Sequence, residues 1–208
     1  MSLARFTAAN RPPARVPESC CEFCARPIGE DHGHVADVRE RRIACACGPC
    51  YVLFTASGAA QGRYKSVPRR YVRLDDVRID PSSWEALALP VDLAFFFFST
   101  PASKPVAFYP SPAGATESLL PLGAWDELVA RVPLLAGMEP DVEAFLTDRT
   151  GPHRSYVVPI DVCYRLVGLI RSTWKGFDGG DEAHRRLDAF FAELDARCGP
   201  ARPQAVRA

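Results

Sequence analysis

Metal-binding side chains are concentrated between Cys20 and Cys50, where six of the eight cysteines and two of the four histidines lie. In chain order, the sulfur and imidazole donors are Cys20, Cys21, Cys24, His32, His34, Cys45, Cys47 and Cys50. Thiolates and imidazoles are the protein ligands that zinc and several other transition metals prefer. The residue types and their spacing therefore predict a metal site in this stretch.

Two Cys-x2-Cys pairs define the expected core of that site. Pairs separated by about twenty residues have the spacing of zinc-ribbon and rubredoxin-type sites, in which each pair supplies two thiolates from one tight turn. The expected ligands are Cys21, Cys24, Cys47 and Cys50. Zinc is the expected metal, and iron or an iron-sulfur cluster is the alternative, because Cys-x2-Cys pairs alone do not discriminate among them.

The same stretch holds more donors than one tetrahedral ion can use. The surplus donors are Cys20, Cys45, His32 and His34. They leave open a different choice of ligands, a cluster, or support of the ligands through hydrogen bonds. We therefore keep Cys45, His32 and His34 as further candidate ligands.

Two other uses of clustered cysteines fit the sequence less well. Disulfide frameworks belong to secreted chains, and we expect no signal peptide, because Met1 is not followed by a basic segment and an apolar run. The tetrapeptide from Cys47 to Cys50, Cys-Gly-Pro-Cys, matches that of thioredoxin-like redox sites. Such a site needs a buried strand before the tetrapeptide, and residues 39–44 do not have the pattern of one.

The Asp31-His32-x-His34 sequence suggests an alternative function. Between two Cys-x2-Cys pairs it is similar to HNH nucleases of the recombination endonuclease VII type, in which a structural zinc braces a histidine that activates water. The resemblance implies that Asp31 and His34 hold a catalytic divalent ion and that His32 is the general base. This chain departs from that family at Tyr51, where the family has asparagine, and in the short interval between Cys24 and Asp31.

Composition limits the remaining possibilities. The chain has 208 residues and is 48% hydrophobic, enough for one sizeable core and a small appended module. Its 25 basic and 25 acidic residues cancel, so no overall field attracts nucleic acid, and nucleic acid is not an expected partner. The apolar run at residues 93–98 is far too short to span a bilayer. We expect a cytoplasmic protein, because thiols stay reduced there and remain able to bind metal.

The expected fold class is α+β. A small Cys-rich metal-binding knuckle at residues 20–56 is followed by a domain at residues 63–198, a mixed and mostly antiparallel sheet with helices packed on it. Residues 57–62 contain two glycines and small side chains and are typical of a hinge. The proline- and arginine-bearing segment at residues 1–19 and the C-terminal residues 199–208 are expected to be disordered tails.

Hydrophobic periodicity places the individual elements. The expected strands are residues 51–54, 71–79, 93–98, 106–109, 142–146 and 155–158. The expected helices begin near Ser83, Ala124, Asp161 and Asp181. The strand at residues 93–98 is apolar at every position, which is typical of a central strand covered on both faces.

Across most of its length, the chain resembles an uncharacterised domain family known chiefly from actinobacteria and often encoded beside the structural genes of high-affinity nickel-iron hydrogenases. The resemblance lies in both cysteine pairs, in the two histidines, and in residues 108–117, 141–144 and 158–164. It implies a hydrogenase accessory protein that helps to assemble the enzyme or holds a metal centre for electron relay. The implied partner is a hydrogenase subunit or a maturation factor. A site of four thiolates leaves no open position for a substrate, so this interpretation favours a protein that is not an enzyme.

Overall fold

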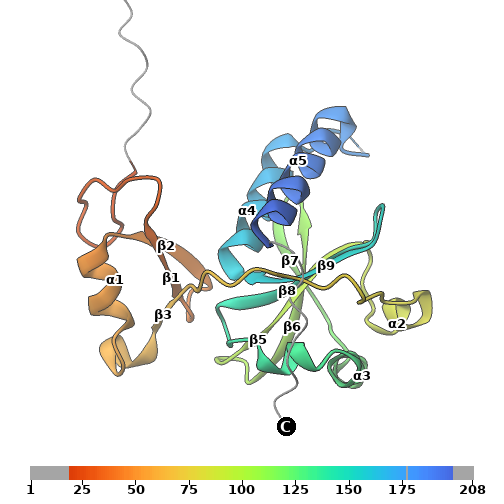
Figure 1. Cartoon of the computed structure of the whole chain (residues 1–208), viewed down its shortest axis with the longest axis horizontal. Helices are drawn as coiled ribbons and strands as arrows, with labels where there is room; N and C mark the ends of the chain where they lie inside the picture. Colours follow the sequence, from red (N-terminus) through yellow and green to blue (C-terminus); the bar gives the residue numbers. More distant parts are fainter. Residues whose placement is uncertain (1–18, 177, 199–208) are drawn as a thin grey trace, which may run out of the picture.

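The computed structural model of the chain describes residues 19–176 and 178–198. The tails predicted at residues 1–19 and 199–208 lie outside these residues, apart from Ser19. Figure 1 shows a small N-terminal lobe beside a larger lobe of sheet and helices. Helices combine with antiparallel sheets, and the cysteine cluster precedes the main sheet, which confirms the predicted α+β class.

The small lobe is a three-stranded antiparallel sheet with one α-helix against it. Its strands are β1 (Gly33–Asp37), β2 (Arg42–Ala46) and β3 (Tyr64–Ser66), in the order β2-β1-β3. Helix α1 (Gly48–Thr55) follows β2 directly. A 3-10 segment (Ala59–Gly62) leads from α1 to β3, which pairs with β1.

Residues 51–54 belong to α1, so the strand predicted from their apolar run is wrong. A short apolar run does not by itself distinguish a strand from a helix. Here Pro49 lies in the first helical turn, where its missing N–H is tolerated and its fixed φ suits the helix. The helix also brings Phe54 onto Phe23, with the two ring centroids 4.3 Å apart.

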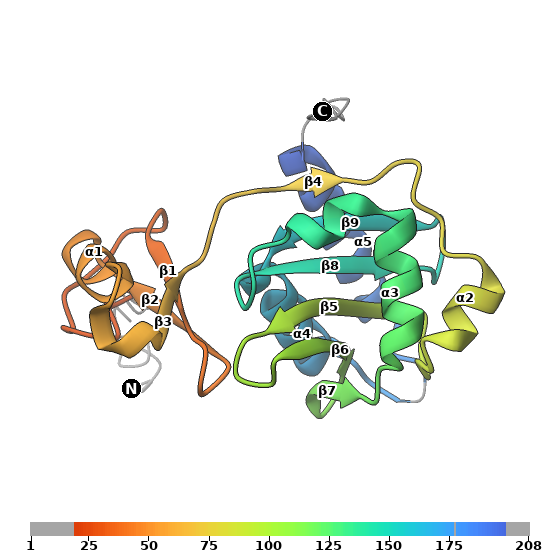
Figure 2. The same ribbon diagram turned by 90° about the horizontal axis from the view of Figure 1, so that it is seen from below.

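The larger lobe is built on a six-stranded sheet with the order β4-β9-β8-β5-β6-β7, in which every pairing is antiparallel. Its strands are β4 (Val72–Arg73), β5 (Leu93–Ser99), β6 (Lys104–Ser111), β7 (Gly114–Ser118), β8 (Glu143–Asp148) and β9 (Arg154–Pro159). Its α-helices are α2 (Pro81–Ala86), α3 (Leu122–Arg131), α4 (Ile160–Thr173) and α5 (Gly180–Cys198). Helices α4 and α5 cover one face of the sheet, and α2 and α3 cover the other (Figure 2).

Most predicted elements of the larger lobe lie within a few residues of their expected positions, but the strand predicted at residues 71–79 is much shorter. Only Val72 and Arg73 pair with β9. The N–H of Val77 donates a hydrogen bond to the carbonyl of Leu74 at 3.2 Å, which closes a turn. The chain therefore leaves the sheet edge soon after β4.

Strand β5 is covered on both faces, as its apolar run predicts. Phe95 and Phe97 belong to the buried cluster under α4 and α5, whereas Ala94 and Phe96 belong to the cluster under α2 and α3. Alternate side chains of a strand point to opposite faces, so one strand supplies both layers of the core. Phe98 stands at the strand's end and is 40% exposed.

The small lobe is fixed to the larger one by shared core and by an ion pair. Ala36 of β1 and Val67, just after β3, are buried in the same cluster as the residues of α4 and α5. Nζ of Lys65, on β3, donates to Oδ2 of Asp141 at 2.7 Å, beside the start of β8. These contacts set how the cysteine-rich segment faces α4.

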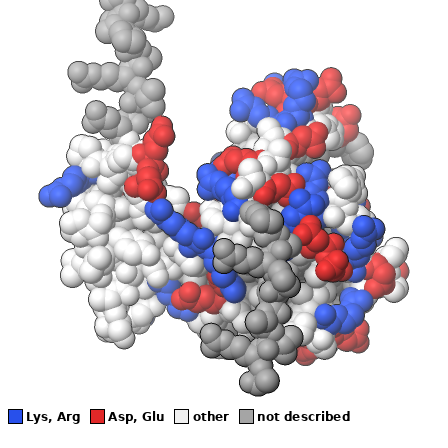
Figure 3. Space-filling model, viewed as in Figure 1, with Lys and Arg blue, Asp and Glu red and all other residues white. Residues whose placement is uncertain are grey.

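Charged side chains are mixed in sign on the face shown in Figure 3. Lysines and arginines alternate with acidic residues over the α4 and α5 region, and much of the small lobe is uncharged in this view. This mixture agrees with the equal numbers of basic and acidic residues in the sequence, 25 of each. No extended positive surface for nucleic acid is visible on this face.

We predict that Phe96→Ala destabilises the protein by about 3–5 kcal/mol, whereas Phe98→Ala, two residues along the same strand, costs less than about 1.5 kcal/mol. Phe96 has no exposed surface and packs on Trp125 and Phe145, with ring centroids 5.5 and 5.8 Å away. Urea unfolding of both variants measures the difference. Equal losses would contradict the two-layer core described above.

Candidate metal centre

The first Cys-x2-Cys pair lies in a tight turn that is fastened to the hairpin formed by β1 and β2. The N–H of Cys21 donates to the carbonyl of Arg26, and the N–H of Ala25 donates to the carbonyl of Cys21, both at 2.8 Å. Glu22 then ties the turn to β2: its N–H donates to the carbonyl of Cys45 at 2.9 Å, and its Oε1 accepts from the N–H of Cys45 at 2.8 Å. The turn is therefore held against β2 by backbone and side chain together.

The second pair lies at the beginning of α1. Cys47 is the residue before the helix, and Cys50 lies in its first turn, so the two side chains point to the same end of the helix. The N–H of Tyr51 donates to the carbonyl of Cys47 at 2.8 Å, which starts the helical bonding. A helix N-terminus favours negative charge, and this position suits thiolates.

The two pairs meet. The sulfur atoms of Cys21, Cys24, Cys47 and Cys50 all lie within 4.8 Å of one another. Those of Cys24 and Cys47 are 3.6 Å apart, far longer than a disulfide bond of about 2.05 Å. Ligands at about 2.3 Å from a tetrahedral ion lie about 3.8 Å apart, so this spacing fits a metal ion bound by four sulfurs.

The thiol pKa values reflect this crowding. Burial raises the pKa of Cys21, but hydrogen bonds from the backbone of Cys47, Phe23 and Cys24 and from the Cys24 thiol outweigh burial and lower it to about 6. The pKa of Cys50 is raised to about 12, first by burial and then by hydrogen bonding to the neighbouring cysteines. The Cys21 thiolate is thus favoured and the Cys50 thiolate is opposed, and a bound cation would favour ionisation of both.

The surroundings of Cys47 differ from the expectation in one respect. Strand β2 ends at Ala46, directly before Cys47, and α1 begins directly after it, although residues 39–44 had not suggested a strand. However, β2 is an edge strand of a small antiparallel sheet, and no parallel βαβ unit surrounds it. Cys47 and Cys50 face the first pair of cysteines, which favours metal binding over thioredoxin-like exchange.

Three of the four surplus donors form a separate group. His34 and Cys45 are directly opposite each other on β1 and β2, and His32 precedes β1. Their nearest donor atoms lie within 4.8 Å of one another. Cys20 is exposed and belongs to neither group of donors in the part of the chain that the structure describes.

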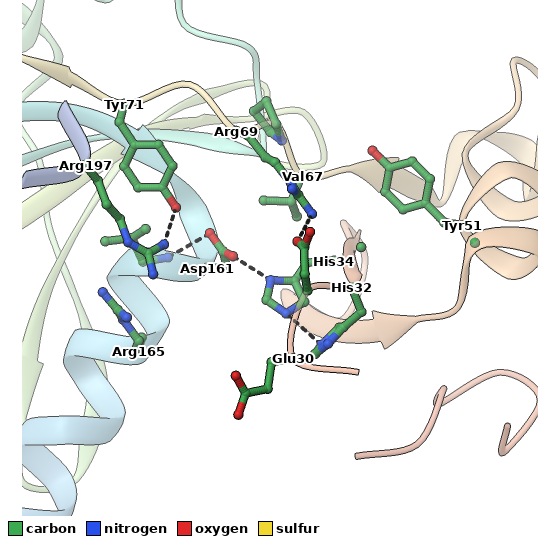
Figure 4. A pocket seen from close by; sticks show the side chains of 15 residues that line it. Glu30, His32, His34, Tyr51, Val67, Arg69, Tyr71, Asp161, Arg165 and Arg197 are labelled. Carbon is green, nitrogen blue, oxygen red and sulfur yellow. Dashed lines mark hydrogen bonds and ion pairs between the residues drawn. The ribbon is translucent and has the colours of Figure 1, made fainter. Parts of the chain in front are cut away.

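The structure adds to this group of donors one residue that the sequence predicted only as the start of a helix. Asp161, at the start of α4, accepts a hydrogen bond from Nδ1 of His34 through its Oδ2 at 2.6 Å (Figure 4). Its other oxygen accepts from the N–H of Val162 at 2.9 Å, which fixes the carboxylate. The two residues are 127 positions apart, and residue types alone carry no signal that would join them.

A cavity of about 960 Å³ lies between the two lobes, and His32 and His34 form part of its wall. Its lining also includes Asp31, Arg69 and Asp161. Asp31 is 86% exposed at its side chain and pairs with Arg69 at 2.6 Å, so its carboxylate is directed to an arginine rather than to His34. The ligand pair implied by the nuclease resemblance is not assembled here.

Comparison with known proteins identifies the chain's family. Residues 20–198 match the profile of DUF5947, described as a family of unknown function. The chain belongs to this family. The match to DUF5947 begins at Cys20 and ends at Cys198, so it includes both donor groups and Asp161. No curated protein and no solved structure matches the chain.

The family assignment confirms the coarser part of the resemblance, membership of an uncharacterised family. None of the helices in residues 19–176 and 178–198 is both long and apolar enough to cross a membrane.

We predict that removing metal with a strong chelator under reducing conditions unfolds residues 20–56 and leaves β5 and β8 folded. Helix α1 buries none of its residues, so its position depends on the sulfur cluster, and a structural zinc site contributes on the order of ten kcal/mol. Hydrogen exchange before and after chelation, and again after zinc is restored, measures this. Unchanged protection of residues 20–56 would show that the lobe folds without metal.

Proposed function

We propose that this DUF5947 protein is a metal-binding accessory protein whose centre is held by Cys21, Cys24, Cys47 and Cys50. The observation that carries the proposal is the convergence of the four sulfur atoms within 4.8 Å. Four protein ligands complete a tetrahedron, and such a site has a structural or electron-transfer role because no position remains for a substrate. We place the protein in a reducing compartment, the cytoplasm, where these thiols stay available.

The chemistry of the donors supports zinc first and iron second. Four thiolates suit Zn²⁺, a single iron ion or an iron-sulfur cluster. Zinc has no accessible second oxidation state, so a zinc centre confines the protein to scaffolding or assembly. An iron centre would allow electron relay.

The proposed partner is a nickel-iron hydrogenase subunit or one of its maturation factors. This part of the proposal is supported by the resemblance to a family encoded beside hydrogenase genes. The two roles, assembly and electron relay, differ in which metal the four sulfurs hold. The nuclease alternative finds no such support, because the carboxylate of Asp31 pairs with Arg69.

We expect an anaerobic preparation of the full chain to be colourless and to contain zinc in the four-sulfur site. Cys24→Ser should lose that ion, whereas Cys198→Ser, a half-buried cysteine at the end of α5, should keep it. Metal analysis and a visible spectrum with and without dithionite provide the measurement. A red or brown protein that bleaches on reduction would identify the metal as iron and favour electron relay. A metal content that Cys24→Ser leaves unchanged would contradict the four-sulfur site itself.

The partner is tested separately. In cells that make both proteins, an affinity-tagged chain should co-purify with a nickel-iron hydrogenase subunit or maturation factor, identified by mass spectrometry. The Cys24→Ser chain should recover less of that partner, because the four-sulfur site loses its metal ion. If the intact chain recovers no hydrogenase component, the proposed hydrogenase partner is wrong, but the proposed metal site is unaffected.

A further inference from the structure

Strand alternation directs one face of the small sheet toward the larger lobe. His34 and Ala36 lie on the same face of β1, and their partners on β2 are Cys45 and Ile43. Ala36 is buried in the core under α4, and Ile43 packs against it. His34 and Cys45 therefore face the larger lobe, at the end of the hairpin where Asp161 lies.

The two histidines are held with their Nε2 atoms facing each other. Nδ1 of His32 is 2.7 Å from the carbonyl oxygen of Gly29, which can only accept a hydrogen bond. Nδ1 of His34 is 2.6 Å from the carboxylate of Asp161, also an acceptor. Both Nδ1 atoms therefore carry hydrogen, and in the neutral rings both Nε2 atoms are unprotonated.

These two Nε2 atoms are only 3.2 Å apart (Figure 4). Two unprotonated nitrogens at this distance repel each other, and a cation bound to both removes the repulsion. Nitrogen ligands about 2.0 Å from a tetrahedral ion lie about 3.3 Å apart, so the observed separation fits a shared metal ion. A shared proton would need only the two nitrogens and would leave the nearby sulfur of Cys45 without a role.

We propose that His32, His34 and Cys45 form a second metal site that binds a divalent transition metal of the zinc type through two imidazoles and one thiolate. Imidazole and thiolate donors together suit Zn²⁺ and its neighbours. Asp161 and the carbonyl of Gly29 hold the rings from behind, as outer partners of metal-bound histidines commonly do.

The second site differs in kind from the four-sulfur site. Three protein ligands leave one tetrahedral position for water or for an oxygen of a bound molecule, an arrangement found in catalytic rather than structural zinc sites. His32 and His34 also line the cavity of about 960 Å³, so a small molecule there can reach the ion. Because Asp161 belongs to α4, occupancy of this site links the two lobes.

Zinc titration of the full chain tests the proposal. Metal-free, reduced protein is titrated anaerobically with Zn²⁺ against a competing chromophoric chelator. The intact chain should bind two ions, and the His32→Ala/His34→Ala double variant should bind one. The matched control, His153→Ala/His184→Ala, changes the other two histidines and should still bind two. Asp161→Asn, which leaves all three donors in place, should weaken the second ion by about 10- to 100-fold.

The outcomes separate this site from the four-sulfur site. Cys45→Ser, which keeps Cys21, Cys24, Cys47 and Cys50, should also bind one ion, and the loss of one ion in this variant supports the second site even if the first proposal fails. Two ions bound by the histidine double variant, or one ion in the intact chain that disappears with Cys24→Ser alone, would overturn it. Histidine ¹⁵N spectra of the intact chain provide a check independent of variant folding: Zn²⁺ should shift the Nε2 signals of His32 and His34 only, and unshifted signals contradict the site.

Discussion

The main constraint on the small lobe is that four sulfur atoms share a space in which no two are more than 4.8 Å apart. Cys21 and Cys24 enter this space from a turn, and Cys47 and Cys50 enter it from a helix N-terminus. The pKa of Cys21 is lowered and that of Cys50 is raised, so the cluster favours ionisation of Cys21 and resists ionisation of Cys50. A bound cation would remove that resistance and join the turn to the helix.

Few apolar contacts accompany the sulfur cluster at α1, among them the ring of Tyr51 against Gly33. The helix buries none of its residues, and its main apolar contact is the stack of Phe54 on Phe23, with Tyr64 edge-on to both rings. By contrast, the larger lobe has a buried layer on each side of β5. The larger lobe is thus organised around two buried layers, whereas the small lobe is organised around a cluster of four cysteines.

The β1–β2 hairpin connects the cysteine cluster with the core of the larger lobe. Val35, Ala44 and Ala46 are fully buried. On the face toward the larger lobe, Ala36 joins the main core and His34 meets Asp161. Because a strand presents alternate residues to opposite sides, one short hairpin can support the cysteine cluster and present a histidine to a helix of the other lobe. The cavity between the lobes is a result of this arrangement.

The sequence by itself determined the parts that depend on local geometry. A Cys-x2-Cys pair brings two sulfurs together within one turn wherever it occurs, and an apolar run such as residues 93–98 must be buried, so the cysteine pairs and the central strand were predictable. The short apolar run at residues 51–54 was misread because its length suits either a strand or a helix. Strand β2 was missed because the four charged residues 39–42 lead into it.

Only the tertiary structure decided how the surplus donors are used. It divided seven of the eight donors into a four-sulfur group and a group of His32, His34 and Cys45, because strand register places Cys45 opposite His34. It also brought Asp161 to His34 across 127 residues. Long-range contacts of this kind follow from how the two lobes pack, and no spacing within the sequence encodes them.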